Sequence, residues 1–138
     1  MSEVIQTYIL LLLLGGMIFF PAVVAPAIFS SLDTKTSGVV LRRLFPNYYL
    51  FIIVMSLIAG FLGKMTSVAT VACIFIFVTT ILVRQVILPK INQWRDEELG
   101  GNSVSAKKFS RSHRLTVILN LLQMALIVYA IGSDFILI

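Results

Sequence analysis

Charged residues are missing from four long stretches of the chain, and this pattern predicts four membrane-spanning helices. The uncharged stretches are Val4–Leu32, Leu44–Gly63, Met65–Val83 and Leu115–Ser133. Each has about 18 residues or more, enough to cross a hydrocarbon core of about 30 Å as a helix. We therefore predict an all-α fold, an integral membrane four-helix bundle. It forms a single transmembrane domain over residues 1–138, with spans at about 4–32, 45–63, 66–88 and 109–133.

Composition supports this class of protein. Hydrophobic residues make up 59% of the chain and charged residues 12%, and the mean hydropathy is +1.01. In a soluble domain about 25% of residues are charged. The chain is therefore too apolar for a soluble domain.

The positions of the cations orient the bundle. Of the eleven Lys and Arg residues, ten lie in segments 33–44 and 84–114, and only Lys64 lies on the other side of the four spans. Cytoplasmic loops hold the excess of Lys and Arg, so we predict cytoplasmic loops at 33–44 and 84–114 and both termini outside (N-out/C-out). Anionic headgroups also account for the net charge of +5, so no nucleic-acid partner is expected.

The last span carries a stripe of polar side chains. His113, Thr116, Asn120 and Gln123 fall within roughly 80° of one another on a helix, along about 15 Å. Lipid cannot satisfy such groups, so the stripe should face protein, a ligand or water. We take these four residues as candidates for ligand binding, and we expect His113 and Asn120 to face the interior of the bundle.

Two polar residues of other helices should reach the same depth. Arg84 lies near the cytoplasmic boundary, where its side chain can either extend to the headgroups or turn inward toward Asn47 or the stripe. We add Arg84 and Asn47 to the ligand-binding candidates, as the expected polar neighbours of His113 and Asn120. The other membrane-edge cations should contact lipid headgroups; they are Arg42, Arg43, Lys107, Arg111 and Arg114.

Several kinds of site are disfavoured by what the spans lack. No Asp or Glu lies inside an uncharged stretch, which excludes paired-carboxylate catalysis within the bilayer and argues against ordinary proton- or sodium-coupled transport. His113 and Cys73 are the only residues of their types and lie in different spans, without metal-ligand spacing. We expect no catalytic residue, no metal and no cofactor, and an enzyme is the less favoured interpretation.

Proline, glycine and aromatic residues suggest where the helices begin, bend and end. We expect a kink at Pro21 and Pro26, followed by a loop at Asp33–Arg43. The second span should have Pro46 in its first helical turn and Tyr48 and Tyr49 in the interfacial aromatic belt, and it should end in a tight turn at Gly63–Thr66. After Pro89 we expect a helical extension that stops at Gly100-Gly101, and then a loop at Asn102–Ser105.

Three motifs occur in order along nearly the whole chain. They are LFPNYY (44–49) preceded by Gly38, Arg84 followed by Pro89, and F-x-x-x-H-x-x-[ST]-x-x-x-N formed by Phe109, His113, Thr116 and Asn120. This pattern resembles the family of small bacterial membrane proteins of unknown function related to eukaryotic transmembrane protein 205. The resemblance implies a multi-pass protein of the bacterial inner (cytoplasmic) membrane. Eukaryotic members are associated with resistance to platinum drugs, which implies the handling of small molecules.

A second resemblance supplies an enzyme alternative. HemJ-type protoporphyrinogen oxidases are also four-span proteins of this size, with a Gly-rich first helix and an aromatic and basic start to the last helix. Their first helix carries a histidine, and no histidine lies between Val4 and Leu32 here. Haem is therefore expected only in this alternative.

Three hypotheses about function remain. The favoured one is a binding or assembly protein whose polar, cationic cleft on the cytoplasmic side holds a lipid, a small anionic ligand or a partner helix. The second is a structural accessory subunit of a larger membrane complex or a homo-oligomer, which partners that co-purify after mild solubilisation would support. The third is a haem- or porphyrin-handling oxidase, which a Soret band would support. The lipid bilayer is a partner in all three.

The predicted orientation can be tested by labelling introduced cysteines in intact cells. A cysteine at Gly101 should resist a membrane-impermeant thiol reagent, because the split of Lys and Arg places this position in the cytoplasm. A cysteine at Lys64, on the other side of the spans, serves as the matched control and should react. Ready labelling at Gly101 with protection at Lys64 would reverse the orientation.

Overall fold

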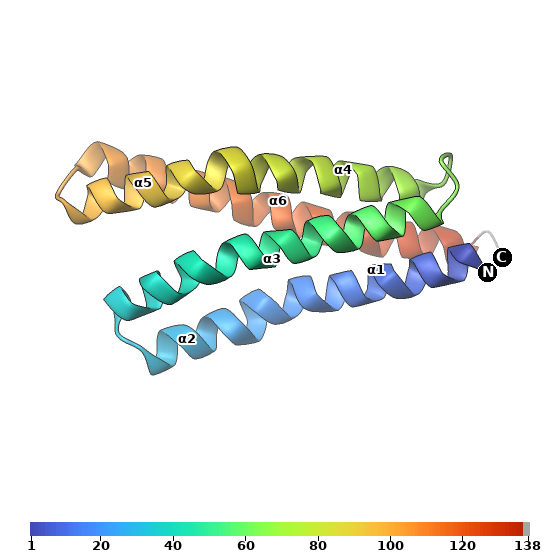
Figure 1. Ribbon diagram of the computed structural model, residues 1–138, viewed down its shortest axis with the longest axis horizontal. Helices are drawn as coiled ribbons and strands as arrows, with labels where there is room; N and C mark the ends of the chain where they lie inside the picture. Colours follow the sequence, from blue (N-terminus) through green and yellow to red (C-terminus); the bar gives the residue numbers. More distant parts are fainter. Residues whose placement is uncertain (137–138) are drawn as a thin grey trace.

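The computed structural model describes the backbone of residues 1–136 and the side chains up to residue 133, and this part of the chain folds into four antiparallel helical rods (Figure 1). The rods are α1 (Ser2–Phe19), η1 (Phe20–Val24) and α2 (Ala25–Ser31); α3 (Thr34–Leu62); α4 (Val68–Leu82), η2 (Val83–Ile87) and α5 (Leu88–Leu99); and α6 (Ser103–Ile136). We call the end with the α2–α3 and α5–α6 connections the basic end. The start of α1 and the α3–α4 turn lie at the other end, the terminal end.

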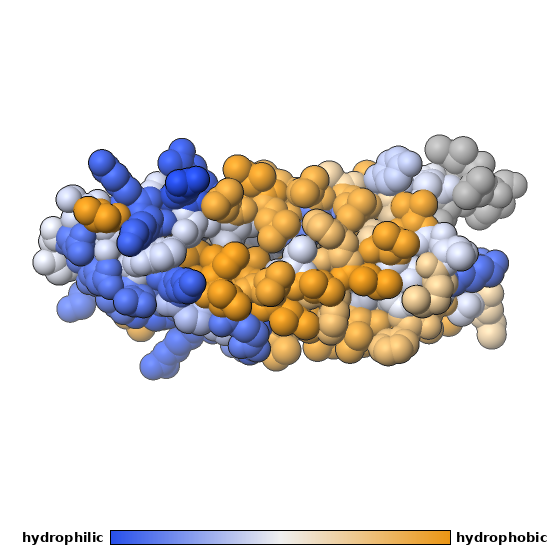
Figure 2. Space-filling view, turned by 90° about the horizontal axis from the view of Figure 1, so that it is seen from above, coloured by the Kyte–Doolittle hydropathy of each residue, from blue (hydrophilic) through white to orange (hydrophobic). Residues whose placement is uncertain are grey.

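All four rods are long and apolar enough to span a membrane. Most large apolar side chains of the rods lie on the outside, where they form a broad hydrophobic band beside the hydrophilic basic end (Figure 2). This arrangement is typical of a bundle whose outer surface faces lipid chains. The predicted all-α bundle with four spans is confirmed, and its orientation relative to the cytoplasm stays a prediction.

The first segment expected to be a cytoplasmic loop is mostly helix. α3 begins at Thr34, so Gly38 lies within it and Pro46 lies well inside the helix rather than in its first turn. The cause is a cap at Asp33, whose Oδ1 accepts hydrogen bonds from the backbone N–H groups of Lys35 (3.0 Å) and Thr36 (3.1 Å). The Thr36 hydroxyl also donates to Asp33 and lowers the pKa of this carboxyl. The stabilisation by the charged cap is therefore present above the ordinary pKa and is lost as the pH falls through the lowered one.

The second expected loop, 84–114, is also mostly helical. The extension after Pro89 is present as α5 and stops at Gly100, as predicted, and Gly101 adopts a φ of 96° that favours glycine. The prediction of a loop at Asn102–Ser105 is wrong. Asn102 Oδ1 accepts hydrogen bonds from the N–H groups of Val104 (3.0 Å) and Ser105 (3.1 Å), so α6 begins at Ser103.

Two rods contain a π-helical turn in the half that leads to the basic end. η1 begins just before Pro21 and ends just before Pro26, and η2 ends shortly before Pro89. A proline cannot donate to the carbonyl four residues earlier and its ring crowds that group, so the wider π turn gives the backbone room. A π turn thus lies where a kink was predicted at Pro21 and Pro26, and the kink itself stays a prediction.

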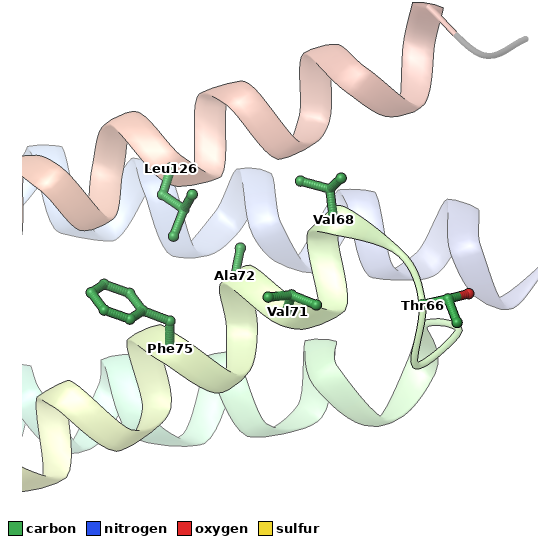
Figure 3. Close-up of a pocket in the computed structure, with 6 residues that line it drawn as sticks. All are labelled: Thr66, Val68, Val71, Ala72, Phe75 and Leu126. Atoms are coloured by element: carbon green, nitrogen blue, oxygen red, sulfur yellow. The ribbon is translucent and has the colours of Figure 1, made fainter.

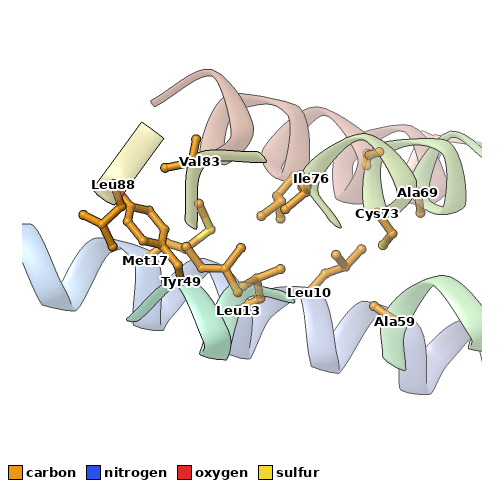
Figure 4. Close-up of a cluster of buried hydrophobic side chains, with 14 residues drawn as sticks. Leu10, Leu13, Met17, Tyr49, Ala59, Ala69, Cys73, Ile76, Val83 and Leu88 are labelled. Carbon is orange, nitrogen blue, oxygen red and sulfur yellow. The ribbon is translucent and has the colours of Figure 1, made fainter. Parts of the chain in front are cut away.

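The core of the bundle is a narrow column of apolar side chains (Figure 4). α1 contributes one face, on which Leu10, Leu13 and Met17 are fully buried. Close approach of α1 to α3 depends on Gly16, because a Cβ at this position would lie 2.5 Å from the Phe51 ring. Small residues thus bring the helices together, as is usual in membrane bundles.

Near the terminal end, hydrogen bonds from Gln6 to the Ala59 carbonyl and to Thr70 join three helices, and we call this group the clasp. The Gln6 side-chain amide of α1 donates to the Ala59 carbonyl of α3 (2.9 Å) and to the Thr70 hydroxyl of α4 (3.1 Å). Gln6 is 2% exposed and Thr70 1%. Beside them, Lys64 and Glu3 form an exposed ion pair (2.9 Å). The clasp joins three helices, and sequence reasoning missed it because Gln6 lies close to the N-terminal charges, where it could equally have faced water.

Gly63 leaves the space that this clasp occupies, which gives a stability prediction. A Cβ at Gly63 would collide with the Gln6 amide and the Thr70 hydroxyl. Gly63→Ala should therefore displace the amide, break its two hydrogen bonds and lower the unfolding free energy in detergent by about 1–3 kcal/mol.

Gly38→Ala is the matched control, because no heavy atom lies within 4 Å of a Cβ there. This variant should unfold no more easily than the parent, since alanine is favoured over glycine inside a helix. Equal unfolding free energies for Gly63→Ala and the parent would show that the clasp contributes little.

Candidate functional site

The polar stripe of α6 faces the interior along much of its length. Thr116 is 7% exposed and Gln123 is 3% exposed. The Gln123 side-chain amide donates to the hydroxyl groups of Thr79 (2.8 Å) and Thr80 (3.2 Å) on α4, and the Thr116 hydroxyl donates to the His113 carbonyl within α6 (2.8 Å). Gln123 therefore ties α6 to α4, and its side-chain N–H groups have protein acceptors.

Asn120 joins α6 to α3 through Tyr48. The Asn120 side-chain N–H donates to the Tyr48 hydroxyl (2.9 Å), and that hydroxyl lies 3.2 Å from the Asn120 Oδ1 and 3.4 Å from the Met17 carbonyl of α1. The Tyr48 ring stacks on Phe20, with centroids 4.5 Å apart. Tyr48 is therefore an interior residue, not a member of the interfacial belt, because its hydroxyl finds two polar groups inside the bundle.

His113 is the one stripe residue that the bundle does not enclose. His113 is exposed, which contradicts the expectation that it faces the interior. The imidazole stacks parallel to the Phe109 ring at 5.9 Å, and the Arg95 guanidinium of α5 lies 5.2 Å from the centre of the same ring. Seven residues separate His113 from Asn120, so the two lie within about 20° of one another on α6, two turns apart. The face that is half-buried at Asn120 is therefore open at His113.

The course of α2 explains this exposure. No residue of η1 or α2 is buried, and α2 packs mainly on α3. Its hydrogen bond to another helix runs from the Ser37 hydroxyl of α3 to the Ile28 carbonyl (3.4 Å). Figure 1 shows α2 and the start of α6 on opposite sides of the basic end. The first rod packs on α6 mainly through α1. Beyond the π turn it continues as α2, which lies away from the start of α6 and does not cover His113.

Arg84 does not join the polar stripe of α6. It is half-buried on η2, and its Nε–H donates to the Pro46 carbonyl of α3 (3.0 Å). Pro46 and Tyr48 are two residues apart, so they lie about 160° apart around α3. Arg84 and Asn120 therefore meet nearly opposite faces of α3, and the expected partnership of these two residues is wrong.

The other candidates are also dispersed over the basic end. Asn47 is exposed and donates to the Arg43 carbonyl (3.3 Å) within α3. Arg42, expected at the headgroups, pairs with Asp96 of α5 through two contacts (2.7 and 3.2 Å) and also donates to the Asn92 carbonyl (3.3 Å). The remaining cations are exposed and have no carboxylate oxygen within 4.0 Å in the described part of the chain; they are Arg43, Lys107, Arg111 and Arg114.

The candidates thus form two separate groups. The first, which we call the α6 site, comprises Tyr48, Thr116, Asn120 and His113. The second is Arg84 on the Pro46 carbonyl, at the junction of α3 and η2. Over the residues that the structure describes, no three His, Cys, Asp or Glu side chains gather as a metal site.

Two shallow grooves lie away from both groups, in the half of the bundle near the terminal end. The larger, of about 380 Å³, is apolar and lies between α4 and α6 (Figure 3); it is lined by Thr66, Val68, Val71, Ala72, Phe75 and Leu126. The second lies between α3 and α4, beside Gly60 and Cys73. Their apolar walls and open shape suit lipid chains, and they include none of the candidate residues.

The bond between Tyr48 and Asn120 can be measured with a double-mutant cycle. Tyr48→Phe and Asn120→Leu each remove one partner, and their effects on unfolding free energy should show a coupling of about 0.6 kcal/mol, and up to about 1.7, as for other hydrogen bonds between membrane helices. Tyr48→Phe combined with Gln123→Leu is the control cycle. Its effects should add, because Gln123 bonds to α4 instead. Additive effects in the first cycle would contradict the bond.

Comparison with known proteins identifies the family of the chain. No curated protein and no solved structure matches it. Residues 8–99, from the first rod to the end of α5, match the family described as Domain of unknown function (DUF4149). The match covers most of the chain and stops before α6, which carries the F-x-x-x-H-x-x-[ST]-x-x-x-N motif. This four-span helical protein belongs to the DUF4149 family.

Proposed function

We propose that the protein binds an amphiphile with a polar or anionic head, a lipid or a small membrane-soluble molecule, at the α6 site. One observation carries this proposal: the polar face of α6 is buried at Thr116, half-buried at Asn120 and open at His113. An open polar face at the edge of a bilayer needs a partner that offers hydrogen bonds on one side and an apolar body on the other. An amphiphile that enters from the leaflet at the basic end meets both needs.

The side chains of the site suit such a ligand. Tyr48 and Asn120 would form its inner limit, because they already bond to one another, and the Tyr48 hydroxyl also donates to the Met17 carbonyl. His113 would meet the head, with the Phe109 ring beside it. The exposed cation Arg114 follows His113 on α6, about 100° around the helix, and favours a negative charge on that head.

The same proposal places the protein in a bacterial inner membrane, within a wider group that includes relatives of transmembrane protein 205. The location is supported by the four apolar helices and by the gathering of Lys and Arg at one end. The wider relationship rests on the order of the three sequence motifs. The handling of small molecules that this resemblance implies agrees with a site that opens sideways toward lipid.

The α6 site can be tested by the retention of ligands on the purified protein. The parent, His113→Ala and Leu115→Ala should be extracted in the same mild detergent, and their co-purifying small molecules compared by native mass spectrometry and lipid analysis. His113→Ala should lose most of a ligand that the parent retains, because the imidazole borders the open face. Leu115, which is exposed on another side of α6, is the matched control and should have no effect.

Two results would contradict this function. Equal retention of the ligand by the parent and by His113→Ala would rule out binding at the α6 site. A stoichiometric protein partner in the parent preparation would favour the interpretation as an accessory subunit. A Soret band in the purified parent would instead identify haem or porphyrin as the bound molecule. Unfolding of each variant should be followed in parallel, so that loss of ligand is not confused with loss of fold.

A further inference from the structure

We propose that Arg84 is a second binding site, distinct from the α6 site, for the phosphate group of a phospholipid in the leaflet at the basic end. The proposal rests on three features of this side chain: the fixed position of its guanidinium group, the lack of a counter-ion among the described residues, and its depth in the bundle.

The guanidinium group is held by one edge and free on the other. Its Nε–H donates to the Pro46 carbonyl at 3.0 Å, and the Nη1 and Nη2 groups have no hydrogen-bond partner among the described residues. A guanidinium group donates in pairs along its edges, and the Nη1–Nη2 edge matches two oxygens of a phosphate or carboxylate. The bond to Pro46 therefore fixes the plane of the group and leaves a two-pronged donor available.

No described carboxylate balances the charge of Arg84. No carboxylate oxygen lies within 4.0 Å of it in the part of the chain that the structure describes, whereas Arg42, one turn away from Pro46 on α3, is paired with Asp96. A carbonyl accepts a hydrogen bond but carries no net charge. A half-buried cation at a membrane edge is costly without an anion, so an anion from the lipid is the partner that this position lacks.

The depth of Arg84 suits a lipid phosphate. It lies 16 residues after Val68, the first residue of α4, which corresponds to about 24 Å along a helix. The hydrocarbon core is about 30 Å thick, so the long side chain can reach the headgroup level at the basic end. Exposed polar groups of Asn47 and Gln85 lie on the same two rods, and neither adds negative charge that would repel a phosphate.

A lipid-binding experiment tests this site. The parent, Arg84→Gln and Arg84→Lys should be delipidated in detergent, supplied with phosphatidylglycerol or with diacylglycerol of the same acyl chains, and analysed by native mass spectrometry. The parent should retain phosphatidylglycerol but not diacylglycerol. Arg84→Gln should reduce this retention about tenfold, as expected for the loss of a charge-assisted pair of hydrogen bonds. Arg84→Lys keeps the charge but not the planar pair of donors, so its retention of phosphatidylglycerol should lie between that of the parent and that of Arg84→Gln.

Lys90→Gln is the matched control, because it removes an exposed cation on the same rod as Arg84 that has no bond to α3 among the described residues and is no part of the α6 site. It should leave retention unchanged. Equal retention in the parent and Arg84→Gln, the same loss in Lys90→Gln, or equal binding of diacylglycerol would overturn the proposal. Displacement of the lipid by millimolar inorganic phosphate would overturn the lipid assignment in favour of a soluble phosphate. If Arg84→Gln fails to fold, Arg84→Lys decides the result.

Discussion

The structure depends on one constraint: polar side chains inside the spans must be bonded within the protein, because hydrocarbon offers no hydrogen bonds. In the described part of the chain every buried side-chain nitrogen and oxygen has a partner. Gln6 joins three helices, Gln123 joins α6 to α4, and Asn120 joins α6 to α3. Apolar contacts between helices gain little over contacts with lipid, so these few polar bonds do much to decide which face each helix turns inward.

The sequence predicted the spans well and their ends poorly. Long uncharged stretches are sufficient for the number of spans, because only a helix can carry such a stretch through a bilayer. Charge says nothing about where the helix stops in water. There the caps decide: Asp33 and Asn102 start α3 and α6 well before the membrane. Both residue types are known helix caps, and this signal was present in the sequence.

The candidate site was predicted in its depth but not in its position around the bundle. The spacing of Thr116, Asn120 and Gln123 correctly indicated one inward face of α6. Two predictions failed because they depended on the neighbouring rods. Arg84 was expected beside Asn120, but it bonds to the Pro46 carbonyl, whereas Asn120 bonds to the Tyr48 hydroxyl. His113 lies within about 20° of Asn120 around α6 and is nevertheless exposed, because α2 turns away beyond η1. No local pattern in α6 could have revealed the course of α2.

The basic end is therefore asymmetric. On one side polar bonds cross between the rods: Arg42 reaches Asp96, and Arg84 reaches the Pro46 carbonyl. On the other side α2 stays with α3, and the structure shows no hydrogen bond from α2 to α6 among the described side chains. Exposed ion pairs contribute only about 0–1 kcal/mol each, so this difference fixes positions more than it adds stability. It leaves the polar face of α6 open at His113 on one side and, among the described residues, leaves the Arg84 guanidinium without a carboxylate partner on the other. The two proposed sites therefore share no residue, and each can be removed without changing the other.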